Sequence, residues 1–257
     1  MPFNGSNKLN YLIHKPIYAK LKFNKKCGWE IISFLMEKLE QISISLDIEE
    51  VKNKLRTGDW DQIQTLLEVA KSLISAKAVY EVCYIEEKLE DTVIIEGIRL
   101  SSRVLRKNLE KVGRVFPYVI TIGANLEQKA DSCMDLLEQY YLDTIGNIAL
   151  VKARNHLEDH LHSRFAISDL SYMSPGSLVD WPIEEQRPLF SILKGAEASI
   201  GVKITENLLM IPRKSVSGIY FPTEITFYSC QLCPRQSCEG RKAQYNEDMA
   251  REYGILK

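Results

Sequence analysis

The sequence contains no uninterrupted apolar stretch of the roughly 18 residues that a membrane-spanning helix requires. Its N-terminal segment also lacks the continuous apolar core of a secretory signal peptide. Neither sign of charge is in excess, because 33 Lys and Arg residues and 34 Asp and Glu residues give a net charge of -1. Such a balance provides no general attraction to nucleic acid or to an anionic membrane. We therefore expect a cytoplasmic protein that binds neither nucleic acid nor membranes.

Several catalytic signatures are absent as well. The sequence has no G-x-S-x-G, G-x-G-x-x-G, Walker A or EF-hand pattern, which argues against hydrolase, dinucleotide-dependent and nucleotide-hydrolysing chemistry. No internal repeat and no Pro/Gly/Ser-rich linker divides the chain. With 257 residues, of which 45% are hydrophobic, the chain has ample material for one continuous domain with a buried core.

The spacing of apolar residues indicates both strands and helices. Alternation over 17–23 predicts a strand, whereas spacing of three and four residues over 29–42 predicts a helix. A second helix is expected over 60–74, after Asp59 as a capping residue. Because helices and neighbouring strands follow without regular β-α-β alternation, the expected class is α+β. Further strands are predicted at 76–85, 92–95, 118–122, 204–210, 215–221 and 225–229, and further helices at 101–112, 125–141, 143–165, 183–200 and from about 244.

The most specific local pattern is a group of three cysteines. Cys230 and Cys233 form a C-x2-C pair, and Cys238 follows five residues later. Two thiolates from one tight turn can bind a zinc ion or an iron–sulfur cluster, so we predict a metal centre at these residues rather than free thiols in a turn. Both kinds of centre need a fourth ligand. The candidates for it are Cys27, Cys83, Cys133, a histidine, a substrate or a partner chain.

Two weaker patterns have an ordinary structural explanation. His156 and His160 are four residues apart in a predicted helix and could chelate a divalent metal, but a solvated polar helix face explains them better. One functional hypothesis is nevertheless a metal-dependent enzyme that binds its metal through this histidine pair. The segment 213–218 could bind an anion through its two basic side chains, or it could simply be a turn that leads into a strand.

Four segments of the second half resemble the activation domain of cobalamin-dependent methionine synthase. They are Ser174-Pro175-Gly176, the DWPIEEQ segment at 180–186, the GVKITE segment at 201–206 and the KSVSG segment at 214–218. Together with the cysteine cluster, they are most similar to the stand-alone activation-domain-like proteins of anaerobic bacteria. The resemblance covers about two-thirds of the chain, from 76 to 241. Its most specific parts are the SPG and KSVSG segments, in that order and spacing.

The resemblance implies a single curved α+β domain with a twisted antiparallel sheet flanked by helices. Residues 76–257 would form the activation-domain-like region with its cysteine-rich tail, and residues 1–75 an N-terminal strand and helices that pack on it. It also implies a function, the reactivation of a corrinoid protein whose cobalt has reached the Co(II) state, by one-electron reduction and methyl transfer from S-adenosylmethionine. The methyl donor would lie along Ser174, Pro175, Gly176 and Ser177 and near Tyr228.

The cofactors and partners follow from the same resemblance. Cobalamin would be carried by the partner, a corrinoid-binding protein or domain of a methyltransferase, and the corrinoid would perform the difficult chemistry. No general acid or base is therefore expected in this chain, which would act as an accessory methyltransferase or reductive activator. The electron would come from a donor such as flavodoxin or ferredoxin, or from a metal centre at the cysteines.

The sequence departs from the family at the segment Arg-x-x-x-Gly-Tyr. Here Tyr172 stands at the arginine position and Ser177 at the tyrosine position. An arginine binds a carboxylate through two parallel hydrogen bonds, which a tyrosine cannot replace. Arg213 or Lys214 is a candidate to supply the missing positive charge. The alternative function is a non-enzymatic module that binds a corrinoid protein, with a structural zinc in the cysteine loop and no methyl donor.

Overall fold

The computed structural model describes residues 19–24, 28–33, 36–55, 59–238 and 240–256. The chain divides into two compact units, Met1–Leu35 and Met36–Lys257. In the first unit, β1 (Ala19–Asn24) and β2 (Gly28–Ser33) pair antiparallel. Strand β1 agrees with the strand predicted over 17–23.

The helix predicted over 29–42 is wrong. The segment contains β2 and β3 (Glu37–Leu39), which pair with β1 and with β4 (Lys77–Tyr80), respectively. Backbone N–H and C=O groups of each strand form hydrogen bonds with its one neighbouring strand among the described residues. This pairing between segments overrides the local spacing of apolar residues, which is a weak signal over so short a stretch.

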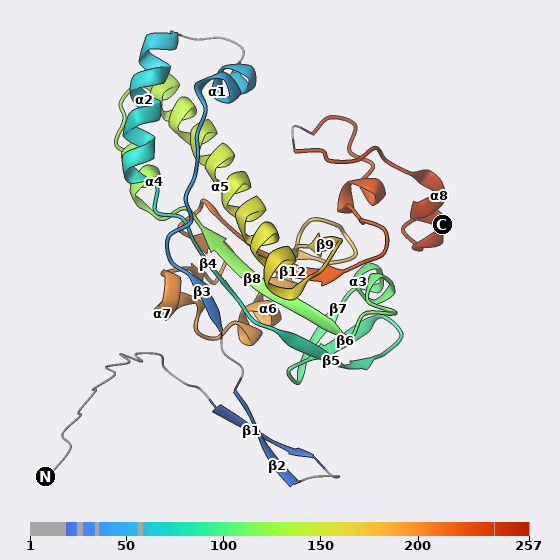
Figure 1. The fold of residues 1–257 in the computed structure, drawn as a ribbon. Helices are drawn as coiled ribbons and strands as arrows, with labels where there is room; N and C mark the ends of the chain where they lie inside the picture. Colours follow the sequence, from blue (N-terminus) through green and yellow to red (C-terminus); the bar gives the residue numbers. More distant parts are fainter. Residues whose placement is uncertain (1–18, 25–27, 34–35, 56–58, 239, 257) are drawn as a thin grey trace, which may run out of the picture. The chain divides into compact units, whose positions relative to one another are not determined.

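An eight-stranded sheet forms the centre of the second unit (Figure 1). Its strands follow the order β3-β4-β8-β5-β6-β7, while β12 pairs with both β8 and β9. All of these pairings are antiparallel, and helices flank the sheet, as the predicted α+β class requires. The remaining strands of the sheet are β5 (Cys83–Lys88), β6 (Thr92–Ile95), β7 (Ile98–Ser101), β8 (Arg114–Thr121), β9 (Leu170–Met173) and β12 (Ser215–Pro222).

Strand β8 contributes to the hydrophobic cores on both faces of the sheet, because its side chains alternate between the two faces. Phe116, Tyr118 and Ile120 belong to the core under α5 (Leu136–Phe165), which also includes residues of α1, α2 and α4. Val119 instead packs with residues around α7. Among the described helices, none combines the length and the apolar character needed to cross a membrane. The other helices are α1 (Ile48–Leu55), α2 (Trp60–Leu73), α3 (Arg103–Asn108), α4 (Asn125–Asp131), α6 (Gln186–Ile192), α7 (Ala196–Ile200) and α8 (Glu247–Glu252).

Capping residues explain where several helices begin. Asp59 accepts hydrogen bonds from the backbone of the first turn of α2, as predicted. Asp135 caps α5 in the same way, so the break between the two predicted helices lies before Leu136 and not near residue 142. The predicted helix over 183–200 is divided into η1 (Ile183–Glu185), α6 and α7.

Two predicted strands after α7 also differ from the structure. The segment 204–210 forms only the ends of a small pair, β10 (Lys203–Ile204) and β11 (Met210–Ile211). No strand forms over 225–229, because the Phe227 N–H donates to the Ser171 hydroxyl at 2.7 Å and η2 (Ser229–Leu232) follows. The proposed boundary near residue 75 stays a prediction, although α1 and α2 share the core under α5.

Candidate functional site

The SPG segment forms a tight turn directly after β9. The Ser177 N–H and hydroxyl both donate to the Ser174 carbonyl, at 3.1 and 2.6 Å, and the Gly176 N–H donates to the Trp181 carbonyl at 2.8 Å. Gly176 has φ = 82°, in the left-handed region that favours glycine. Pro175 is buried beneath the turn, while Gly176 and Ser177 are exposed. The turn therefore presents its backbone to solvent from a fixed base.

Asp180 anchors this turn to the start of α3. Its side chain, only 5% exposed, accepts hydrogen bonds from the Ser102 hydroxyl at 2.6 Å and from the Val104 N–H at 2.9 Å. It also accepts one from Arg103 Nε at 3.1 Å. The next residue, Trp181, is completely buried. The DWP part of the sequence therefore holds the SPG turn in place.

We expect Asp180→Ala to lower the free energy of unfolding by about 2–4 kcal/mol, because it leaves buried donors at the start of α3 without an acceptor. Urea denaturation would measure the change. Asp248→Ala is the matched control, since Asp248 is 95% exposed and, among the described residues, pairs only with Arg251. It should change stability by less than about 0.5 kcal/mol. Equal stability of the two variants would show that Asp180 does not anchor the turn.

The KSVSG segment leads into β12, which begins at Ser215, and contacts the SPG turn through Gly218. A Cβ atom at this glycine would lie 2.4 Å from the Met173 carbonyl oxygen, 2.8 Å from Ser174 Oγ and 2.9 Å from the Tyr118 hydroxyl oxygen. No side chain fits in this space. The structure thus brings together the two most specific segments of the sequence, and the absence of a side chain at Gly218 makes the contact possible.

Three tyrosines form a cluster beside this contact. The ring centroids of Tyr118 and Tyr220 are 4.7 Å apart, and those of Tyr172 and Tyr220 are 5.5 Å apart. The Tyr220 hydroxyl donates to Glu158 Oε2 at 3.3 Å. Burial is the main cause that raises the pKa of each tyrosine. The cluster is therefore aromatic and uncharged at neutral pH.

Two cations lie beside the outermost ring of this cluster. The Arg154 guanidinium, from α5, is 4.7 Å from the centroid of Tyr172, and Lys242 Nζ is 5.3 Å from the same centroid. Within the described part of the chain, neither side chain forms an ion pair, and Arg154 Nε is buried without a hydrogen-bond partner. Burial, followed by the charge of Arg154, lowers the pKa of Lys242. Positive charge is thus concentrated at the position where the family resemblance places an arginine.

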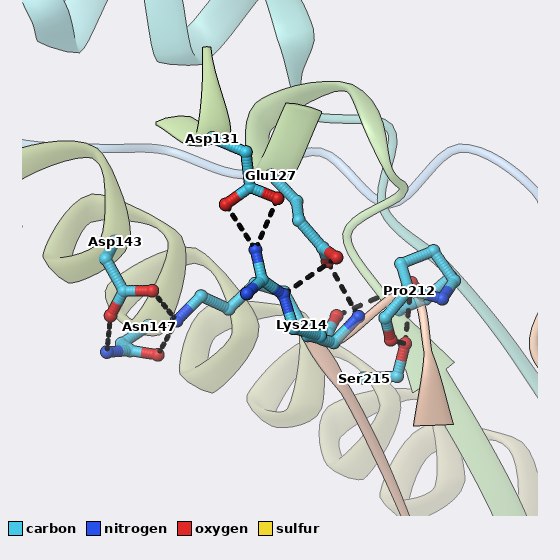
Figure 2. Close-up of polar contacts among 9 residues, drawn as sticks. Glu127, Asp131, Asp143, Asn147, Pro212, Lys214 and Ser215 are labelled. Carbon is cyan, nitrogen blue, oxygen red and sulfur yellow. Dashed lines mark hydrogen bonds and ion pairs between the residues drawn. The ribbon is translucent and has the colours of Figure 1, made fainter. Parts of the chain in front are cut away.

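Arg213 and Lys214, the cations considered from the sequence, lie elsewhere and are already paired (Figure 2). They precede β12, whereas Tyr172 pairs with Tyr220 near the other end of that strand. Their network borders a cavity of about 430 Å³ beside α4 and the start of α5. The partners are Glu127 at 2.8 Å and Asp131 at 2.6 Å for Arg213, and Asp143 at 2.6 Å and Asn147 at 2.7 Å for Lys214.

Sequence reasoning missed Arg154 and Lys242. A partial signal existed for Arg154, because it lies four residues before Glu158 and therefore on the same face of the predicted helix. Nothing in the sequence, however, indicated that this face lies over Tyr172. Lys242 gave no signal, because its position depends on the path of the irregular segment that contains the cysteines.

That segment, the cysteine loop (230–238 and 240–242), is held by Arg241. The Arg241 guanidinium donates to the carbonyls of Cys230 at 3.1 Å and Cys233 at 3.3 Å, and also to the carbonyl of Arg235. The Cys230 thiol accepts a hydrogen bond from the Lys242 N–H at 3.4 Å. The loop therefore fixes the backbone of Lys242 next to the tyrosine cluster.

The thiols of the cysteine loop do not gather around one point. Cys230 and Cys233 are partly buried, while Cys238 is exposed. Over the residues that the structure describes, no three His, Cys, Asp or Glu side chains are arranged to hold a metal ion. This arrangement does not fit a zinc ion or an iron–sulfur cluster, so the metal centre at Cys230, Cys233 and Cys238 stays a prediction. Cys27, one candidate for the fourth ligand, lies outside the described residues.

Tyr228, predicted to pack near the donor, precedes the cysteine loop. Its N–H donates to Gln231 Oε1 at 2.9 Å, which places it at the start of η2. Tyr228 is also the last of the groups, after burial, Glu158 and Cys230, that raise the pKa of Tyr172. Tyr228 therefore lies near the tyrosine cluster, in an irregular segment and not in the strand that was expected.

The histidine pair has another explanation in the structure. His160 Nε2 lies 3.0 Å from the Tyr80 hydroxyl oxygen, within hydrogen-bond distance, and burial lowers the pKa of His160. His156 is exposed. In the described region no third ligand joins them. The hypothesis of a metal-dependent enzyme built on this pair gains no support from the structure.

Comparison with known proteins finds similarity in part of the same segments. Residues 177–243, which include Gly218 and the cysteine loop, match the family model described as "Vitamin B12 dependent methionine synthase, activation domain". A solved structure described as the MetH reactivation domain bound to AdoHcy aligns with a TM-score of 0.51 and 15% sequence identity, over 86% of this chain and 86% of that chain. The resemblance to the methionine synthase activation domain is confirmed.

The activation-domain fold of the chain is thereby shown, with its antiparallel sheet and flanking helices. The SPG turn itself lies just before the segment that the family model covers. The similarity to stand-alone activation-domain-like proteins stays a prediction. A search of curated proteins finds no match.

Proposed function

We propose that this protein reactivates a cobalamin-dependent methyltransferase protein and binds S-adenosylmethionine for that purpose. The observation that carries the proposal is the contact between the SPG turn and Gly218 beside the tyrosine cluster. The match of residues 177–243 to the activation-domain family and the shared fold support it. The solved structure with this fold is described as bound to AdoHcy.

The residues at this place suit a nucleoside with a charged amino-acid tail. The exposed backbone of Gly176 and Ser177 allows close approach, and Ser174 and Pro175 fix the turn from below. The unpartnered Arg154 Nε is a buried donor that a polar ligand can satisfy. When bound, S-adenosylmethionine supplies an electrophilic methyl group.

The protein's own part in the reaction is positioning. The raised pKa values keep the hydroxyls of Tyr118, Tyr172 and Tyr220 protonated, so these side chains do not compete as nucleophiles for the methyl group. The aromatic rings and buried Pro175 exclude water from one side of the turn. Holding the donor against the partner's corrinoid then accelerates transfer through proximity and orientation.

Reactivation requires one electron and one methyl group at the cobalt. The cobalamin belongs to the partner, a corrinoid-binding protein or domain. Because the thiols of the cysteine loop are not gathered for a metal, we propose an external electron donor such as flavodoxin or ferredoxin. Metal and acid-labile sulfide analysis of protein purified without oxygen tests this choice, since iron with sulfide would instead indicate a cluster held by the chain.

A direct test of the proposal combines binding and reactivation. Calorimetric titration with S-adenosylmethionine and with AdoHcy should show saturable heat. A Co(II) corrinoid protein, supplied anaerobically with reductant and S-adenosylmethionine, should change its visible spectrum to that of the methylated form only when this protein is present. No heat and no thermal shift at millimolar ligand would contradict a methyl-donor function.

The departures at Tyr172 and Ser177 favour one alternative. The chain could be a non-enzymatic module that binds a corrinoid protein and contains a structural zinc at the cysteine loop. This alternative predicts zinc in the purified protein and binding of the corrinoid domain without binding of S-adenosylmethionine. The same titration therefore separates the two functions.

A further inference from the structure

The surroundings of Tyr172 carry unbalanced positive charge. Arg154 and Lys242 both approach the ring of Tyr172 within the distance of a cation–π contact. Glu158 is the carboxylate of this cluster, and it accepts a hydrogen bond from Tyr220 and is not ion-paired with either cation. Two cations thus share their surroundings with one carboxylate. The site as it stands can accept one further negative charge.

The two cations also disfavour each other. The positive charge of Arg154 contributes to the lowered pKa of Lys242, after burial of the ammonium group itself. Like charges held close together raise the free energy of a site, and an anion beside both lowers it. A carboxylate is suited to this geometry because it has two oxygens, so that the guanidinium and the ammonium can each receive one.

The two cations come from different parts of the chain, and each is held in place. Arg154 belongs to α5, a helix of 30 residues whose neighbours Ala153 and Leu157 are completely buried. Lys242 directly follows Arg241, which fastens the cysteine loop through backbone carbonyls. The Lys242 N–H also donates to the Cys230 thiol. The cysteine loop therefore carries Lys242 to the site.

We infer that Arg154 and Lys242 together bind the carboxylate of the ligand's amino-acid tail, a role that Tyr172 cannot perform. This inference rests on the proposed function, because the amino-acid tail is that of S-adenosylmethionine or AdoHcy. Arg213 and Lys214 do not take this role, since carboxylates of the α4 and α5 region already neutralise them (Figure 2).

Two nucleosides that differ in the tail test the inference. AdoHcy carries the carboxylate on its amino-acid tail, whereas 5′-methylthioadenosine has the same nucleoside and a methyl thioether, without the carboxylate or the amino group. By calorimetry, the unmodified protein should bind AdoHcy more tightly than methylthioadenosine. Arg154→Gln and Lys242→Gln should each weaken AdoHcy binding about 10- to 100-fold, the effect of losing one charge-assisted hydrogen bond. Binding of methylthioadenosine should change less than about threefold, because it makes no such bond.

Matched variants separate this role from a structural one. Arg164→Gln on the same helix and Lys203→Gln on β10 remove a charge from exposed residues and should leave both affinities unchanged. Lys242→Arg keeps the charge and should retain most of the AdoHcy affinity. Thermal melts identify any variant that fails to fold. If Arg154→Gln fails to fold, Lys242→Gln still decides the matter, because residue 242 lies in an irregular segment outside the hydrophobic cores.

The outcomes distinguish the inference from the proposed function. If the unmodified protein binds AdoHcy and both variants bind it equally well, the carboxylate contact is overturned while the function stands. If the unmodified protein binds AdoHcy and methylthioadenosine with equal affinity, the carboxylate contact is overturned as well. If it binds neither nucleoside, the methyl-donor function itself is overturned.

Discussion

Gly218→Ala should lower the free energy of unfolding by about 3 kcal/mol or more and abolish AdoHcy binding. The added Cβ would lie 2.4 Å from the Met173 carbonyl oxygen, and this neighbour is backbone and cannot rotate away as a side chain can. Either β12 must move away from β9 or the SPG turn must shift. Both movements destabilise the folded protein, as extra atoms in a well-packed region do. Urea denaturation and calorimetric titration measure the two effects.

Gly113→Ala is the control for this prediction. A Cβ at Gly113 would meet nothing within 4 Å, and its φ is not in the left-handed region. The free energy of unfolding of Gly113→Ala should stay within about 1 kcal/mol of that of the unmodified protein, because the substitution changes only the conformational entropy of the unfolded chain. If Gly218→Ala proved equally stable and still bound AdoHcy, the close contact between the two motif segments would not be needed for the site.

Arg241→Ala should release the cysteine loop and weaken AdoHcy binding as much as Lys242→Gln does. The substitution removes the donor for the carbonyls of Cys230, Cys233 and Ala243, and Lys242 then loses its fixed backbone. We expect a loss of about 2–3 kcal/mol in the free energy of unfolding, the range for hydrogen bonds from a charged donor. Denaturation, titration and limited proteolysis of the loop provide the readouts.

Arg251→Ala is the corresponding control on α8. Its guanidinium pairs with Glu247 and Asp248 one turn away, and both partners are well exposed. Such exposed pairs within one helix contribute about 0.3–0.5 kcal/mol to the free energy of unfolding, so Arg251→Ala should have only this small effect. An Arg241→Ala variant with unchanged loop proteolysis and unchanged AdoHcy affinity would show that Lys242 reaches Tyr172 independently of the loop.

Local chemistry made some elements predictable from the sequence. Asp59 caps α2 because its side chain and the first turn of the helix are adjacent in the chain. The strand predicted over 215–221 agrees with β12 for a similar reason, since alternation and β-branched residues are local properties. The SPG and KSVSG segments were also identified, although only the structure shows that they touch.

Other features depend on contacts between distant segments. The 29–42 stretch has helical spacing, yet it pairs as strands with partners that local spacing cannot reveal. Arg154 and Lys242 are separated by α5, β9, β12 and the cysteine loop, and only folding brings both to Tyr172. Arg213 is a candidate from the sequence because it is a basic residue next to the KSVSG segment, but its carboxylate partners come from α4.

Strand β12 pairs with both β8 and β9, and Lys242 follows it by 20 residues. During synthesis β8, α5 and β9 therefore leave the ribosome before the strand that joins them and before the second cation. A partly made chain has the tyrosines Tyr118 and Tyr172 but neither Gly218 nor Lys242. Under the proposed function, a bound methyl donor would stabilise only completed molecules, by mass action. Its concentration would then affect how long a newly finished molecule survives proteolysis.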